Sequence, residues 1–466
     1  MIEQYEKEAN DDNIKQSLQE DLLHRNEFVL RFLRLLNSID GPCTIAVDAP
    51  WGEGKTFFVR QVQMLLDTAN GQCSHKVLEE KELSKLTGAE LSQELYSNPQ
   101  VCVYYDAWAN DQDEDPLLSL VSEILLGINE RYHGTEAFTH GRNLRDLAGS
   151  IIELITGRNV KGIQETVSGK DYLKQIEERR NLQEKVNEFL DNVTNERGNR
   201  LVIFIDELDR CSPVFVVRLL ERVKHYFNRE KITFVFSVHL AELQNTVRAY
   251  YGENFNGAAY LDRFFDLRIE IPKTDYSQFY SEIGLQGTDS DGNTSIREVC
   301  LTFAKLHQFS LRSTMRYWSM VRIAEKNLPK DSGYYLDNEN VANARRFAFQ
   351  FLVPAAMGIK CMDADAYQQF ATGTDDQYLL DLCTDTGSSI RELLEYYLQA
   401  RHQNKALGLS ALEDPLRTQL HKAYQVIFQQ NTVENPSEET EIIGKCAFSS
   451  SLRDFVLNIS SRTANR

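Results

Sequence analysis

The sequence has no uninterrupted apolar run long enough to cross a membrane. A helix that spans a bilayer needs about 20 predominantly apolar residues. The longest apolar stretches, at 232–238 and 347–359, are shorter than that, and the second contains Gln350 and Pro354. We therefore expect a chain without a membrane span.

Cysteine pairs of the metal-binding kind are missing as well. None of the eight cysteines belongs to a C-x-x-C pair, and the cysteines and nine histidines show no zinc-ligand spacing. The amino-terminal residues do not have the pattern of a secretory signal. Reduced thiols and a cytoplasmic location are the expected combination.

Basic residues are outnumbered by acidic ones. The chain has 51 lysines and arginines against 69 aspartates and glutamates, a formal net charge of −18. This balance opposes broad electrostatic attachment to nucleic acid, so there is no strong nucleic-acid signal. The sequence also has no guanine-reading [NT]-K-x-D motif, no metal-nuclease motif and no Ser-His-Asp arrangement. Any cleaving activity is therefore expected to belong to another chain.

A phosphate-binding loop is the first positive signal. Residues 49–56 read Ala-Pro-Trp-Gly-Glu-Gly-Lys-Thr, between an apolar run and a helix-forming segment. They match the G-x-x-x-x-G-K-[ST] pattern except at Ala49, and the surrounding strand and helix disfavour a simple polar turn. Glycine lets the backbone approach phosphates, and the following helix directs its positive end at them. Lys55 is expected to reach the β and γ phosphates, and Thr56 to help hold Mg²⁺. The expected nucleotide-binding residues are Pro50, Trp51, Gly52, Glu53, Gly54, Lys55, Thr56 and Phe57.

A second apolar strand, at 201–206, ends in the adjacent acids Asp206 and Glu207. A continuous apolar run of this length is typical of a parallel strand that is buried on both faces. We expect Asp206 to orient Mg²⁺ and Glu207 to activate the water that attacks the γ phosphate. The alternative is a core strand that ends in an acidic surface turn, which the upstream Lys55 disfavours.

The two motifs resemble those of the KAP family of P-loop NTPases. Residues 49–56 are similar to the family's G-P-W-G-S-G-K-T, and 206–213 to its D-D-L-D-R-C-x-P. Segments 103–108 and 260–263 are similar to its aromatic-N-A-W and Y-L-D-K segments. Many members of this family carry transmembrane helices within the NTPase domain. Because this sequence has no apolar run long enough to span a membrane, it is expected to be of the soluble type. The departures from the family pattern are Ala49 for glycine, Glu207 for aspartate, Asp106 for asparagine and Arg263 for lysine, and none removes a group needed for hydrolysis.

Analogy with AAA+ relatives adds three candidate catalytic residues. Arg210 and Arg263 are candidate arginine fingers, which would stabilise charge on the γ phosphate. Arg210 could equally form a structural pair with Asp206 or Asp209. His239, at the end of a further apolar strand, is either a polar sensor of the γ phosphate or a capping or loop histidine. If Arg263 reaches the site of a neighbouring subunit, hydrolysis requires an oligomer.

Alternating apolar runs and helical patterns predict an α/β fold with a five-stranded parallel sheet. The acid next to Asp206 favours the additional-strand branch of P-loop NTPases, which resembles AAA+ and STAND ATPases. We expect a KAP-type domain at 1–275, with a helical insertion at about 110–198, and a helical domain at 276–466. The expected strands are 43–47, 101–105, 201–206, 232–238 and 267–271, and one long helix is expected at 14–39.

The predicted function is Mg²⁺-dependent ATP hydrolysis that is coupled to homo-oligomerisation or to control of a partner protein. The resemblance also implies a role in defence against phage, with which bacterial relatives are often associated. One alternative is a nucleotide-gated scaffold with little turnover. Another is a nucleic-acid-stimulated motor, which the acidic balance and the absence of a strand-tracking element disfavour.

Overall fold

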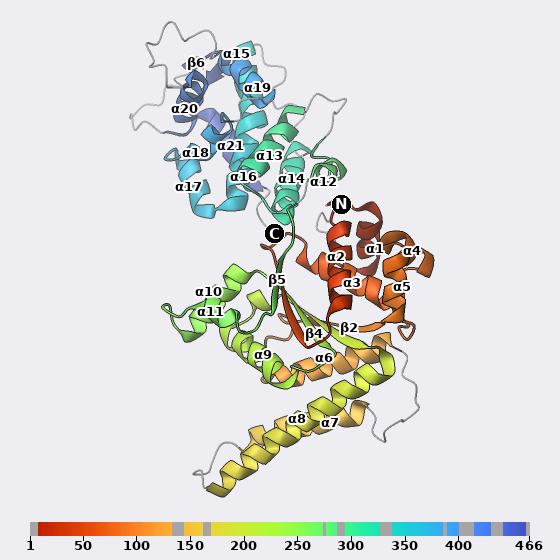
Figure 1. The fold of residues 1–466 in the computed structure, drawn as a ribbon. Coiled ribbons are helices and arrows are strands. Elements are labelled where there is room, and N and C mark those ends of the chain that lie inside the picture. The colour runs from red at the N-terminus through yellow and green to blue at the C-terminus, as the bar shows by residue number, and fades with distance from the viewer. Residues whose placement is uncertain are drawn as a thin grey trace. The chain divides into compact units, whose positions relative to one another are not determined.

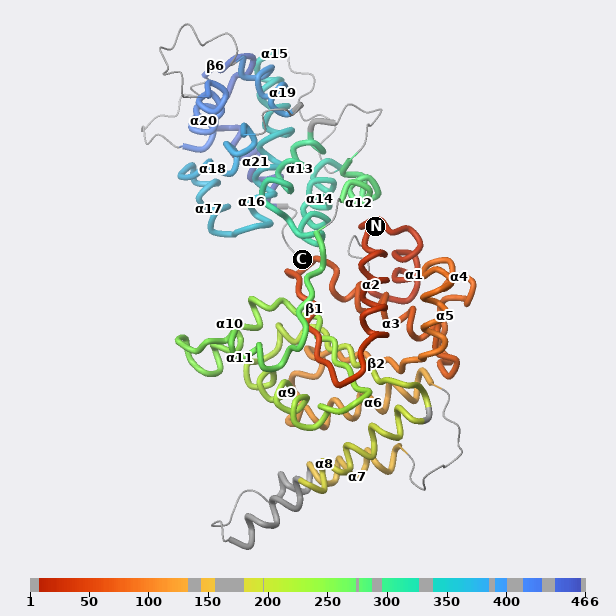
Figure 2. The backbone as a smooth tube through the Cα atoms, viewed as in Figure 1, coloured from red at the N-terminus to blue at the C-terminus, as the bar shows by residue number. Residues whose placement is uncertain are grey.

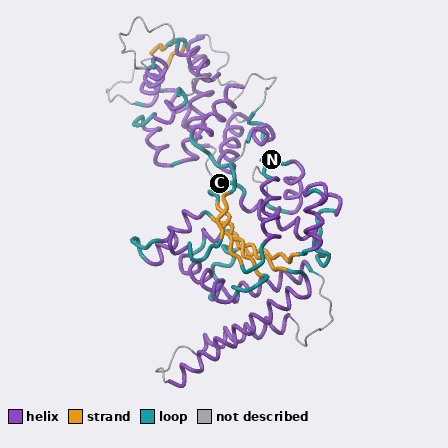
Figure 3. Tube along the Cα trace, in the orientation of Figure 1, coloured by secondary structure: helices purple, strands orange, loops and turns teal. Residues whose placement is uncertain are grey.

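The computed structural model describes residues 8–132, 144–161, 169–273, 276–286, 294–326, 338–384, 389–399, 414–429 and 441–462. The chain divides into two compact units, one formed by Glu8–Asp275 and the other containing Tyr276–Arg466. The first unit is built around a sheet, whereas the second is almost entirely helical (Figure 3).

A five-stranded sheet with the strand order β2-β3-β4-β1-β5 forms the centre of the first unit (Figure 1). All four neighbouring pairs are parallel. The order inserts β4 between β1 and β3, which is the arrangement expected of the additional-strand branch, so the predicted fold class is confirmed. The strands are β1 Cys43–Asp48, β2 Gln100–Asp106, β3 Arg200–Asp206, β4 Ile232–Val238 and β5 Leu267–Glu270.

Each face of the sheet is covered by its own set of helices (Figure 1). Ile45 and Val47 of β1 belong to a hydrophobic cluster with α1 to α5, whereas Ala46 belongs to a second cluster with α6 to α11. Because successive side chains point to opposite faces, burial of both faces explains the continuous apolar strands. The helices are α1 Asp11–Glu20, α2 Asn26–Ser38, α3 Lys55–Ala69, α4 Glu80–Thr87, α5 Ala89–Ser97, α6 Pro116–Arg131, α7 Leu144–Lys161, α8 Gly169–Arg197, α9 Pro213–Tyr226, α10 Leu240–Tyr251 and α11 Gly257–Leu261, with a 3-10 turn at Leu208–Arg210.

The single helix predicted at 14–39 is wrong, because α1 and α2 are separate helices. The backbone turns between them through Asp21 and His24, with φ angles of 46° and 50°. The Asp21 carboxylate accepts hydrogen bonds from the backbone N–H groups of Arg25 and Asn26, at 2.8 Å and 3.0 Å. This carboxylate satisfies donors at the start of α2, which would otherwise have no partner. Both helices bury apolar residues in the same hydrophobic cluster, so periodicity alone did not reveal the break.

Among the residues that the structure describes between β2 and β3, three helices are present. The first of them, α6, packs on the sheet with α9, while α7 and α8 lie alongside each other (Figure 2). The two-stranded β6-β7 pair is antiparallel and belongs to the second unit.

The second unit is organised around α16, whose residues 353–359 are all buried. Pro354 lies near the start of this helix and lacks the N–H group that would continue the hydrogen-bond ladder of the helical residues before it. A π-helical segment, Ala348–Leu352, precedes it. The elements are α12 Ser277–Glu282, α13 Thr294–Leu306, α14 Leu311–Lys326, α15 Glu339–Phe347, α16 Val353–Met362, α17 Ala364–Thr372, α18 Gln377–Asp381, α19 Ser389–Leu398, α20 Pro415–Phe428, β6 Glu441–Ile443, β7 Cys446–Phe448 and α21 Ser451–Arg462.

All eight cysteines are thiols without a disulfide partner. Cys43 and Cys361 are partly exposed, and the other six are buried. Burial raises the pKa of the Cys73 and Cys300 thiols to about 12, so these side chains are unreactive in the folded chain.

Among the described residues, none of the helices combines the length and the apolar character that crossing a membrane requires.

Candidate nucleotide-binding site

The carboxyl ends of the strands bring the predicted acids and the phosphate-binding loop to one edge of the sheet. Asp106 at the end of β2 pairs with Asp206 at the end of β3, and Asp206 pairs with Ser237 of β4. Asp48, the last residue of β1, pairs with Val238. Open α/β sheets bind their ligands at this edge.

The loop between β1 and α3 has a backbone that glycine adopts most readily. Gly52 and Gly54 have φ angles of 85° and 82°. Space is restricted as well, because a Cβ atom on Gly54 would lie 3.3 Å from Nη1 of Arg25. The loop leads directly into α3, so the unpaired N–H groups of the first helical turn begin at Lys55. Left-handed glycines followed by a helix start are features expected of an anion-binding loop.

The Lys55 side chain is folded back onto this loop. Its Nζ atom donates hydrogen bonds to the carbonyl oxygens of Ala49 and Pro50, at 2.7 Å and 3.3 Å. The residue is only 9% exposed. Burial lowers the pKa of the Lys55 ammonium, and the charge of nearby Asp209 opposes that shift. A buried ammonium that is bound to uncharged carbonyls gains strongly from a phosphate anion beside it.

Thr56 and Asp206 are in direct contact, although 150 positions separate them. The Thr56 hydroxyl donates to Oδ2 of Asp206 at 2.6 Å, and the backbone N–H of Glu207 donates to Oδ1 at 3.0 Å. Oxygen atoms of this kind are the ligands that Mg²⁺ prefers. Among the described residues no group of three or more His, Cys, Asp or Glu side chains could hold a metal ion. A magnesium ion would therefore need further ligands from water and from nucleotide phosphates.

Tyr104 and Arg60 extend this contact, and sequence reasoning missed both. The Tyr104 hydroxyl donates to Oδ2 of Asp206 at 2.9 Å. The Arg60 guanidinium lies 3.4 Å from the centre of the Tyr104 ring. Tyr104 lies two positions before Asp106 on β2, and strand alternation places it on the α3 side of the sheet. The alternation of side chains along β2 was the sequence signal that could have placed Tyr104 near Asp206.

Glu207 is held in an ion pair with Arg210. Its backbone is left-handed, with a φ of 60°, and its Oε1 atom lies 3.1 Å from Nη1 of Arg210. The structure thus pairs Arg210 with Glu207 and not with Asp206 or Asp209. Burial raises the pKa of Glu207, while the positive charge of Arg210 lowers it. The Arg210 guanidinium also lies 5.7 Å from the ring of Trp108, which is 56% exposed.

Asp209 joins the phosphate-binding loop to the end of β4. Its Oδ2 atom accepts a hydrogen bond from Nε1 of Trp51 at 2.6 Å and another from the backbone N–H of His239 at 3.0 Å. Asp209 is 6% exposed, so burial strengthens both bonds. Sequence reasoning placed Asp209 only as an alternative partner of Arg210.

The His239 ring lies at the same edge of the sheet. His239 is the residue before α10, but its side chain makes no capping hydrogen bond. Its ring centre is 5.7 Å from that of Trp51. Its Nδ1 atom is buried, and no described residue offers it a hydrogen-bond partner. The capping alternative therefore does not describe this side chain, and a buried nitrogen of this kind fits a ligand-facing role.

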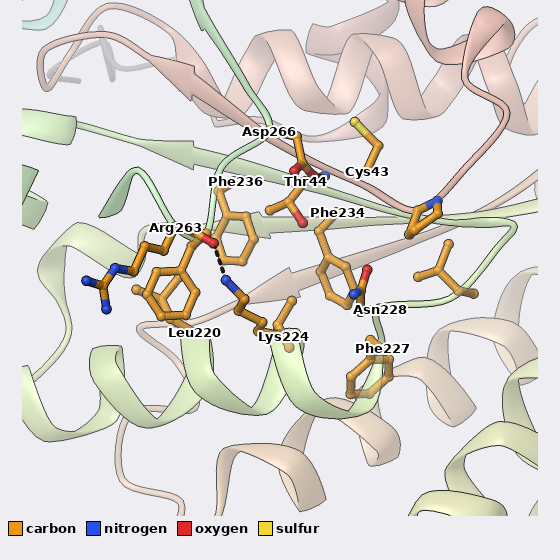
Figure 4. A pocket seen from close by; sticks show the side chains of 14 residues that line it. Cys43, Thr44, Leu220, Lys224, Phe227, Asn228, Phe234, Phe236, Arg263 and Asp266 are labelled. Carbon is orange, nitrogen blue, oxygen red and sulfur yellow. Dashed lines mark hydrogen bonds between the residues drawn. The ribbon is translucent and has the colours of Figure 1, made fainter. Parts of the chain in front are cut away.

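Arg263 lies at the other end of the strands. It precedes β5, whose first residue, Leu267, pairs with Ile45 near the start of β1. Its carbonyl oxygen accepts a hydrogen bond from Nζ of Lys224 (Figure 4). Together with Lys224 and Thr44 it lines a cavity of about 260 Å³ near the amino ends of β1 and β4. The structure does not bring Arg263 to the phosphate-binding loop of its own chain.

No curated protein sequence matches the chain. Among solved structures, the ORC2 protein of Aeropyrum pernix in ADPNP and ADP complexes matches with 12% identity and a TM-score of 0.32, over 94% of this chain and 93% of that one. Drosophila ORC bound to GC-rich DNA and Cdc6 matches with 10% identity and a TM-score of 0.30, over 90% of this chain and 51% of that one. Both similarities are too weak to contribute to the assignment.

The sequence profile of the KAP family P-loop domain matches residues 25–325. This range covers more than half of the 466 residues and includes the phosphate-binding loop, Asp206 and Glu207. The chain belongs to the KAP family of P-loop NTPases.

Proposed function

We propose that the protein binds Mg²⁺ and ATP at the carboxyl edge of its sheet and hydrolyses the γ-phosphate bond. The observation that carries this proposal is the 2.6 Å contact between Thr56 and Asp206. It joins the phosphate-binding loop to the acidic end of β3, and hydrolysis needs both. We propose ATP and not GTP as the nucleotide because the sequence has no guanine-reading [NT]-K-x-D motif.

The residues present fit a magnesium nucleotide. Lys55 and the loop amides would bind the phosphates, while Thr56 and Asp206 would hold the metal. The bound nucleotide supplies the phosphoanhydride bond that is cleaved. Glu207 would accept a proton from the attacking water. The Nδ1 atom of His239 has no hydrogen-bond partner among the described residues, which supports a sensor role for that ring.

Two measurements test this function: calorimetry detects MgATP binding, and phosphate release detects hydrolysis. We expect heat on titration with MgATP and steady release of phosphate, and excess EDTA should stop the release because magnesium would be removed. Phosphate release that is insensitive to EDTA would contradict the proposed metal dependence. Absence of both heat and release would exclude nucleotide hydrolysis by this chain.

A nucleotide-gated scaffold is the second candidate, and the Glu207–Arg210 pair favours it. Arg210 binds Oε1 of Glu207, the carboxylate that would activate water. Turnover would then be slow until Arg210 moves, and the protein would act mainly through its nucleotide-bound conformation. The glutamine variant discussed below separates the two candidates.

We further propose that turnover is coupled to homo-oligomerisation or to control of a partner protein, in a setting such as defence against phage. Membership of the KAP family supports the setting by analogy alone. Stimulation of phosphate release by DNA or RNA would instead favour the nucleic-acid motor, which the net charge of −18 disfavours.

Arg263→Ala should lower turnover while leaving MgATP affinity nearly unchanged. Arg263 is exposed and remote from its own phosphate-binding loop, so any action on the γ phosphate would occur in a neighbouring subunit. The loss is expected to be about 10³-fold if it is the arginine finger. The measurement is phosphate release as a function of protein concentration.

Arg268→Ala is the matched control for this variant, since Arg268 lies on β5 and pairs with Asp262. It should leave turnover unchanged. Normal turnover in Arg263→Ala would remove Arg263 from the mechanism.

A further inference from the structure

A buried ion pair joins the phosphate-binding loop to the start of α2. Glu53 stands between the two glycines with positive φ angles, and Arg25 comes from the turn between α1 and α2. Nη1 of Arg25 donates to the carbonyl oxygen of Glu53 at 2.5 Å, and Nη2 lies 3.6 Å from Oε2 of the Glu53 carboxylate. The two side chains are 7% and 8% exposed.

An acid at this position is electrostatically unfavourable for a loop that binds phosphates. Asp48, Asp206 and Asp209 already act on Lys55 from the surrounding edge. A further buried carboxylate would repel a triphosphate, and burial keeps salt from screening that repulsion. A buried carboxylate without a cation would also be costly to the fold itself. Glu53 therefore needs a positive partner.

The turn between α1 and α2 fixes Arg25 in place. Asp21 caps the first turn of α2 through the N–H groups of Arg25 and Asn26. The Asn26 side chain donates to the carbonyl oxygen of Leu18 at 2.7 Å, which ties the turn back to α1. The Arg25 guanidinium also packs against Gly54, where a Cβ atom would lie 3.3 Å from Nη1. A planar guanidinium can contact a carbonyl and a carboxylate at the same time, whereas an ammonium is a single point charge.

We propose that Arg25 is a positioning residue for nucleotide binding, because its guanidinium neutralises the buried Glu53 carboxylate within the phosphate-binding loop. The inference rests on the proposed binding of MgATP at this loop. According to this inference, the turn between α1 and α2 affects nucleotide affinity through Arg25.

The test is the MgATP dissociation constant, measured by calorimetry, of the wild type, Arg25→Gln, Glu53→Gln and the double variant. Arg25→Gln removes the charge and should weaken binding about tenfold or more. Glu53→Gln should bind as tightly as the wild type or more tightly. The double variant has neither charge and should bind within about threefold of the wild type. This rescue distinguishes charge compensation from a merely structural role.

A matched control is Arg131→Gln. Arg131 pairs with the buried Asp67 near the carboxyl end of α3, so its loss should lower the melting temperature without changing MgATP affinity. If Arg25→Gln does not melt cooperatively, the double variant alone decides, since it should fold and bind nearly as the wild type does.

Wild-type affinity in Arg25→Gln would overturn the inference, as would a folded double variant that binds about tenfold more weakly than the wild type. Failure of the wild type to bind MgATP would overturn the proposed function, and this inference with it.

Discussion

Lys55→Met is expected to abolish measurable MgATP binding, with affinity at least about 10²-fold below that of the wild type. The Lys55 ammonium is buried and held by two loop carbonyls, so a phosphate beside it replaces neutral acceptors with an anion. Methionine keeps the length of the side chain and removes the charge. Calorimetric titration with MgATP measures the loss.

The fold should survive this substitution. Burial lowers the pKa of Lys55, which means that the charged form is disfavoured in the folded chain, so removal of the charge should leave the melting temperature unchanged or raise it. Lys224→Met is the control, because Lys224 lies at the other end of the strands beside Arg263. Retention of wild-type affinity by a folded Lys55→Met variant would show that nucleotide does not bind at this loop.

Glu207→Gln should reduce phosphate release by about 10² to 10⁴-fold while MgATP affinity stays close to that of the wild type. Glutamine preserves the size of the side chain but cannot accept a proton from water. Steady-state phosphate release and calorimetry on the same preparation measure the two quantities. Glu221→Gln, at an exposed position on α9, serves as the control and should behave as the wild type.

The same experiment separates an ATPase from a scaffold. Similar and negligible release by the wild type and Glu207→Gln, with MgATP bound by both, would favour the scaffold. For an ATPase, the dependence of turnover on pH gives a further prediction. Burial raises the pKa of Glu207 and the base must be ionised, so turnover should fall with decreasing pH at a value above the ordinary glutamate pKa.

The strands were predictable because strands that are buried on both faces consist of continuous apolar residues. Helices cover both faces of the sheet, so strands such as β4 appear as continuous apolar runs, and the prediction for 232–238 coincides with Ile232–Val238. The two motifs of the candidate site could be recognised in the sequence for a different reason. Each places its functional groups within a few neighbouring positions, where a local pattern can reveal them.

The contacts that support the site were not predictable in this way. Tyr104 reaches Asp206 across 102 positions, and Trp51 reaches Asp209 across 158. These contacts arise from strand order and from side-chain direction, which no short pattern contains. Arg25 is a related case, because its contact with the loop depends on the turn that divides a stretch of uniform helical periodicity.

Each of the two units contains three buried cysteines, so their thiols can report when that unit opens. A buried thiol reacts with an alkylating reagent only when the surrounding structure opens. Mass spectrometry of alkylated peptides should therefore yield a separate opening free energy for each unit of the unsubstituted chain, with nucleotide present or absent. Cys73, Cys102 and Cys211 would report on the unit that carries the sheet, and Cys300, Cys383 and Cys446 on the helical one.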